Sequence, residues 1–245
     1  MRKYISILAV ALVALFATSC ELESGTEPNP NRANDLLWRG TKAVFNGMSQ
    51  HILTVACLND TMRNAEYGKA PYEVYNPDIT ESEGIYTISY GHDTYRINTA
   101  GKKLEEGGEW TINVQYGPYL EPYKLGTVKG VVGEPTKFSI DFDDIYAHGA
   151  SFHNVLKSEV EYSYNASDEC LDTILTNAEG YSVEDYNSTT PDYIIEFKAT
   201  NPLVFYGGII HSGEVDIIYK DNILHTEKGV KVSISNKITT FVTQN

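Results

Sequence analysis

Two periodicities divide this chain into an N-terminal helical part and a longer strand-rich part. From about residue 33 to 65, apolar residues recur at spacings of three, four and seven, which is typical of one buried face of a helix. These positions are Leu37, Val44, Met48, Ile52, Val55, Leu58 and Met62. Gly40 and Gly47 weaken the pattern, so one bent helix or two shorter helices fit it equally well.

From residue 72 onward, apolar and polar residues alternate, which is the period of a strand with one buried face. The alternation is clearest over residues 86–97, 110–116, 138–142 and 160–164. The pattern predicts a mainly β protein (α+β minor), with the N-terminal helix followed by about ten antiparallel strands. A sandwich and a curled, barrel-like sheet both fit. No linker interrupts residues 32–245, which are predicted to form a single domain.

The first residues have the composition of an export signal. Arg2 and Lys3 precede an apolar run, residues 5–16, that is too short to span a bilayer. Small residues follow, and then Cys20. This order predicts a lipoprotein signal peptide over residues 1–19, cleavage before Cys20 and attachment of diacylglycerol and palmitate to it. Residues 20–31 are rich in Pro, Gly and polar residues and are expected to be a flexible tether.

Residues 19–24 read Ser-Cys-Glu-Leu-Glu-Ser, which resembles the outer-membrane and surface lipoproteins of Bacteroidota. In that group, acidic residues after the lipidated cysteine direct export to the cell surface. The resemblance implies an outer-membrane, lipid-anchored protein, exposed at the surface or else on the periplasmic face. Asp60-Thr61-Met62 and Asp172-Thr173-Ile174 also match the group's short O-glycosylation sequon, which implies sugars on Thr61 and Thr173.

Charge narrows the set of partners. The whole chain has a net charge of −14, and the predicted leader carries two basic residues, so the mature chain has a net charge of −16. An acidic surface repels phosphate backbones, which argues against nucleic acid as a partner. It also argues against electrostatic binding to anionic lipid. Neutral glycans, peptides or divalent cations fit this charge better.

Two cysteines remain after Cys20. In an oxidising compartment, Cys57 and Cys170 could form a disulfide that closes a long loop. The alternative is two buried free thiols that pack as small apolar groups. The spacing of the two residues leaves both interpretations open.

One acidic cluster has the ligand types of a cation site. It comprises Asp141, Asp143 and Asp144, with His148 shortly after. Carboxylate oxygens suit Ca²⁺, and a mixture with imidazole suits Zn²⁺. Asp141 also fits the polar face of a strand, and Asp143 and Asp144 also fit a turn. We expect no cofactor other than such a cation.

Aromatic residues suggest a ligand surface around residues 116–123. Two prolines and a glycine in this segment predict a loop that carries Tyr116, Tyr119 and Tyr123, with Trp110 on the strand before it. A tyrosine offers a flat apolar ring and one hydroxyl, which suits a sugar or a peptide. The alternative is that these rings fold back and cover the end of the core.

No catalytic motif is recognisable, and the histidines are scattered. The first hypothesis is therefore a non-enzymatic, membrane-anchored binding or accessory protein for capture of a glycan or peptide nutrient, acting with an outer-membrane protein partner. The second is a structural or adhesive component of a fimbria-like assembly, which would need a pairable strand edge within residues 231–242. The third is a hydrolase whose site is built from scattered residues.

Overall fold

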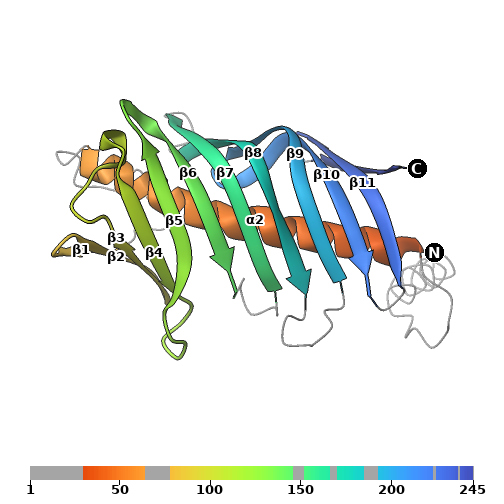
Figure 1. Ribbon diagram of the computed structural model, residues 1–245, viewed down its shortest axis with the longest axis horizontal. Coiled ribbons are helices and arrows are strands. Elements are labelled where there is room, and N and C mark those ends of the chain that lie inside the picture. The colour runs from red at the N-terminus through yellow and green to blue at the C-terminus, as the bar shows by residue number, and fades with distance from the viewer. Residues whose placement is uncertain are drawn as a thin grey trace, which may run out of the picture. The chain divides into compact units, whose positions relative to one another are not determined.

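The computed structural model contains one long helix and one large sheet (Figure 1). Its described residues are 30–63, 78–145, 152–165, 170–184, 193–222, 225–236 and 238–244. The predicted signal peptide and most of the tether lie outside these residues. Residues 33–245 form one compact unit.

Helix α2 runs without interruption from Pro30 to Arg63. The prediction of a helix is confirmed, and neither Gly40 nor Gly47 divides it. A short 3-10 helix, η1 (Leu104–Glu106), lies between β3 and β4.

Within the described residues, twelve strands follow α2, and each is hydrogen-bonded to its neighbours in chain order. Their bounds are β1 Asp78–Ser82, β2 Ile85–Tyr90, β3 Asp93–Asn98, β4 Glu109–Gln115, β5 Tyr123–Val131, β6 Glu134–Asp144, β7 Phe152–Asn165, β8 Cys170–Glu184, β9 Tyr193–Tyr206, β10 Ile209–Asp221, β11 Thr226–Ser235 and β12 Ile238–Gln244. All eleven pairings are antiparallel. The predicted mainly β, antiparallel fold is confirmed.

The sheet curls around the C-terminal half of α2. His51 contacts Tyr95 on β3, whereas Leu53 lies close to Gly208 in the turn between β9 and β10. His51 and Leu53 are two positions apart, which in a helix separates them by about 200° around the axis. Strands from distant parts of the sheet therefore reach opposite sides of the helix, and residues 51–59 are almost all buried.

The core is formed by the helix stripe and the inward positions of the strands. Along β6, Phe138, Ile140 and Phe142 are buried while the residues between them are at least partly exposed. Phe45 of α2 packs edge-on against Phe197 of β9, with ring centroids 5.3 Å apart. Figure 1 shows α2 crossing the strands of the sheet.

Candidate functional site

A buried polar cluster joins α2 to three strands and the loop residue Tyr116. The imidazole of His51 and the carboxylate of Asp144, at the end of β6, are each 1% exposed. His51 Nε2 lies 3.1 Å from Asp144 Oδ2. The hydroxyls of Tyr116 and Tyr123 both donate hydrogen bonds to Asp144. On the other side of the ring, the hydroxyl of Tyr95 lies 2.8 Å from His51 Nδ1.

The hydrogen bonds of this cluster occupy both ring nitrogens of His51. A carboxylate only accepts, so Nε2 donates to Asp144. Nδ1 faces the hydroxyl of Tyr95, and the hydroxyl of Tyr116 lies 3.1 Å from Nε2 on the same side as the carboxylate. Each nitrogen thus has a polar partner, which is the condition for a stable buried polar network.

The tyrosines of this cluster are held in their neutral, donating form. Burial, reinforced by Tyr90 and Asp144, raises the pKa of Tyr95 well above its usual value. Burial and the neighbouring Asp144 raise the pKa of Tyr116 in the same direction. His51 links α2 to this cluster, so its contacts hold the helix on the sheet.

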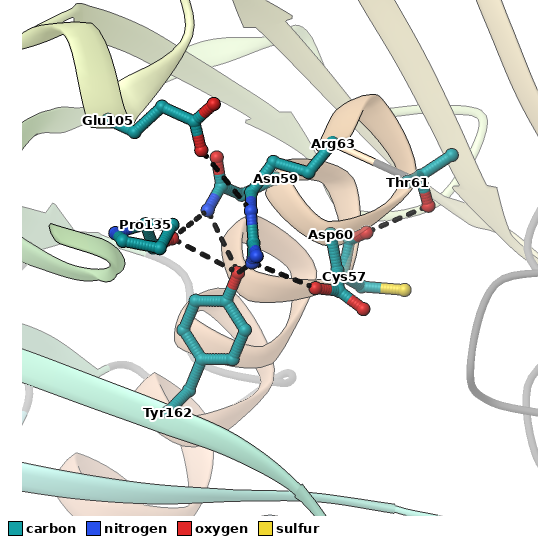
Figure 2. Close-up of polar contacts among 8 residues, drawn as sticks. All are labelled: Cys57, Asn59, Asp60, Thr61, Arg63, Glu105, Pro135 and Tyr162. Carbon is teal, nitrogen blue, oxygen red and sulfur yellow. Dashed lines mark hydrogen bonds and ion pairs between the residues drawn. The ribbon is translucent and has the colours of Figure 1, made fainter. Parts of the chain in front are cut away.

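A second polar cluster fastens the C-terminal end of α2 (Figure 2). Asn59 Nδ2 donates to the backbone oxygen of Pro135 and to the hydroxyl of Tyr162, each at 2.8 Å. Arg63 forms ion pairs at 3.2 Å with Asp60 and with Glu105 of η1. The guanidinium is thus occupied within the protein, and the cluster docks the helix end on β6, β7 and η1.

A hollow of about 660 Å³ lies on the face of the sheet that points away from α2. We call it the outer hollow. It is lined by Val155, Lys157, Glu179, Gly180, Tyr181, Glu196, Phe197, Lys198, Asp216, Ile217, Ile218 and Gly229. Its volume is within the range of small-ligand sites, about 300–1,000 Å³.

Strand register arranges the outer hollow into two rows. The first row contains one aromatic, two aliphatic and one acidic side chain. Val155 pairs with Tyr181, Tyr181 with Glu196, and Glu196 with Ile218. Gly229 of β11 lies opposite Ile218 in this row and pairs in turn with Gln244 of β12.

The second row alternates in charge from strand to strand. In register order it reads Asp141, Lys157, Glu179, Lys198, Asp216 and Lys231. Lys157 pairs with Asp141 at 3.2 Å, and Lys198 with Glu179 at 3.8 Å. These exposed pairs contribute little stability, so their donors and acceptors remain accessible to a ligand at small cost.

Tyr181 has a defined orientation in the outer hollow. Its ring meets that of His153 edge-on, with centroids 5.3 Å apart and an interplanar angle of 81°. His153 is in turn held by Asp143, with Nε2 and Oδ1 2.6 Å apart. The Asp143–His153 pair thus supports the ring from one side.

The predicted cation cluster is split between the two faces of the sheet. Asp143 and Asp144 belong to β6 rather than to a turn. Asp141 and Asp143 are exposed on the outer face, whereas Asp144 is buried against α2. His148 lies outside the described residues. Within the described part of the chain, no three His, Cys, Asp or Glu side chains are grouped as metal ligands.

The predicted aromatic surface is not assembled from its four residues. Trp110 is fully buried and donates its indole N–H to the backbone oxygen of Lys102 at 2.8 Å. Tyr116 and Tyr123 point to Asp144, as the alternative of inward-folded rings expects. Tyr119 alone is exposed, at 96%.

Cys57 is a free cysteine, buried in the core. The structure therefore forms no Cys57–Cys170 disulfide, and Cys57 has the alternative role of a small buried group. Burial raises the pKa of its thiol to about 12. The side chain of Cys170 lies outside the described residues.

The two predicted glycosylation threonines differ in environment. Thr61 is partly buried, and its hydroxyl donates to the backbone oxygen of Cys57 at 2.8 Å. Thr173 is 1% exposed on the inner face of β8. A sugar on Thr173 would have no room in the folded sheet, whereas Thr61 lies near the end of α2.

Sequence reasoning missed His51, Tyr95 and Tyr181. A signal existed for His51, which falls on the helical stripe seven residues after Val44 and four before Val55. A buried histidine at such a position requires a polar partner. Nothing in the sequence set Tyr181 apart, because its importance comes from its neighbours on other strands.

Comparison with known proteins found no match: no family model, no curated protein and no solved structure resembles this chain significantly. Within the described residues, no helix combines the length and apolar character needed to cross a membrane. Function must therefore be argued from the geometry of the chain itself.

Proposed function

We propose that this chain is a non-enzymatic, lipid-anchored surface protein that captures a glycan in the outer hollow. The apolar run and small residues that precede Cys20 support the lipid anchor. The tether that follows Cys20 would hold the folded body away from the membrane. The protein would deliver its ligand to an outer-membrane partner and would need no cofactor for binding.

The observation that carries this proposal is the combination of Tyr181 with the charged row beside it. A tyrosine ring packs against the apolar face of a sugar. Glu179 and Asp216 supply acceptors for sugar hydroxyls, and Lys157 and Lys198 supply donors. Because the charges alternate, the lining has little net charge, which suits a neutral glycan better than a polyanion.

A glycan array probed with the full chain in detergent tests this proposal. We expect binding that falls at least about fivefold in Tyr181→Ala, since an aromatic stack on a ring is worth about 1–3 kcal/mol. Tyr119→Ala is the matched control, because Tyr119 is an exposed tyrosine that does not line the hollow. Equal loss in both variants, or binding only to peptides, would contradict the proposal.

The anchor is tested separately. Palmitate incorporation into the chain should disappear in Cys20→Ala while glycan binding is unchanged. Incorporation that persists in this variant would remove Cys20 as the lipidated residue and leave the binding site untouched.

A further inference from the structure

The sheet is open, so β1 and β12 form its two edges. In the described sheet, β1 pairs with β2 only and β12 with β11 only. An edge strand presents backbone N–H and C=O groups that another extended strand can pair with. This feature is independent of the outer hollow and of the proposed function.

The two edges differ in chemistry. β1 is five residues long, carries Asp78 and Glu81, and is largely exposed. Short length and charge are two of the ways in which proteins protect an edge from pairing. β12 has seven residues, Ile-Thr-Thr-Phe-Val-Thr-Gln, with no charge, proline or glycine. Five of the seven are β-branched, which favours an extended conformation.

From this contrast we propose that β12 pairs antiparallel with β12 of a second copy, giving one continuous sheet across a closed dimer. The strand is complementary to itself. Centred on Phe241, antiparallel pairing places Thr239 opposite Thr243 and Thr240 opposite Val242. Such threonine and β-branched pairs are favourable across strands, and no like charges face each other.

Electrostatics permits this contact despite the acidic chain. The basic residues of the neighbouring strand β11 are Lys228 and Lys231. Across the pairing, β11 and its counterpart are separated by three strand spacings, about 14 Å. This exceeds the Debye length of about 8 Å at physiological ionic strength, so repulsion between these lysines is largely screened. An isologous contact also closes at two copies, because each β12 edge is used once.

Sedimentation equilibrium of the full chain in a density-matched detergent tests the dimer. We expect Thr240→Lys to raise the dimer dissociation constant at least about tenfold, because a charge on an edge strand opposes pairing. The matched control is Thr80→Lys, at an exposed position of β1, which should leave the dissociation constant unchanged. Circular dichroism spectra that match the parent chain show that both variants are folded.

A second measurement keeps the proposal testable if Thr240→Lys does not fold. Amide hydrogen exchange of the parent chain should become slower with increasing protein concentration in β12 and stay constant in β1. A parent chain that is monomeric, with concentration-independent exchange, would overturn the proposal. So would open-ended oligomers that Thr80→Lys abolishes, since these would place β1 in the contact and support a fimbria-like assembly instead.

Discussion

Removal of the Asp144 side chain should lower the free energy of unfolding strongly. Its carboxylate accepts hydrogen bonds from Tyr116, Tyr123 and His51, and it is buried between α2 and β6. In Asp144→Ala all three donors lose this acceptor, whose side chain is 1% exposed in the folded chain. Leaving a buried donor without its acceptor costs about 1–3 kcal/mol for each group. A domain is stable by about 5–15 kcal/mol, so a large part of the total would be lost.

Asp143→Ala is a matched control one residue away. Asp143 points to the other face of β6, is 57% exposed, and pairs with His153. Exposed ion pairs contribute about 0–1 kcal/mol. The free energy of unfolding, measured by urea titration with circular dichroism, should therefore fall several times more in Asp144→Ala than in Asp143→Ala. A difference below about 1 kcal/mol would refute the role given to the buried network.

A double-mutant cycle tests the direct contact. Tyr123→Phe removes one hydroxyl that donates to Asp144. In the parent chain this should cost about 1.5–3 kcal/mol, the usual value for a hydrogen bond to a charged group. In the Asp144→Ala background the same change should cost almost nothing, because the hydroxyl no longer has its acceptor. Equal costs in the two backgrounds would show that Tyr123 acts through packing alone.

Three further predictions concern packing, thiol reactivity and pH. Gly180→Ala would place a Cβ 1.9 Å from the backbone oxygen of Val155, so it should lower the free energy of unfolding by at least about 1–3 kcal/mol in urea titration. Cys57, with its raised pKa and burial, should resist iodoacetamide in the native chain and react in urea, as peptide mass mapping would show. The pKa of Tyr90 rises from 10.0 to about 12, so stability should be constant below pH 10 and fall above it, and less steeply in Tyr90→Phe.

Each of these has a contradicting result. A Gly180→Ala chain as stable as the parent would mean that β7 and β8 can separate at no cost. Labelling of native Cys57, or a Cys57 peptide that stays unlabelled in urea until a reductant is added, would contradict the free buried thiol. For Tyr90, the sign follows from linkage: the folded chain binds the proton more tightly, so its advantage disappears as pH rises past the unfolded pKa. An unchanged alkaline slope in Tyr90→Phe would exclude this residue as a source of the effect.

The fold was predictable because its signals are local. The helical stripe and the alternating strands each report burial over a few residues, and antiparallel neighbours in chain order follow from short connections. Gly40 and Gly47 suggested a break that did not occur. A glycine costs a helix about 1 kcal/mol, which the burial of Phe45, Met48 and other stripe residues more than offsets.

The sequence predicts the inward positions of two residues of the buried network. Phe138, Ile140 and Phe142 define an inward series on β6, and the next position of that series is Asp144. The alternation over residues 110–116 already placed Tyr116 in the inward series of β4, although the glycine and prolines after it also suggested a loop. Continuing the β6 period by one step would have placed Asp144 inside as well, where it must find partners.

The identity of those partners was beyond the sequence for a geometric reason. His51 and Asp144 are 93 positions apart, and they meet only because of where α2 crosses the sheet. That crossing depends on the curl of the whole sheet, which sums small twists over many strands. The outer hollow has the same origin, since Tyr181 acquires its charged neighbours through register with β7 and β9. Local periodicity therefore predicts which face a side chain takes, whereas the chemistry of a site depends on register and curvature that no short segment encodes.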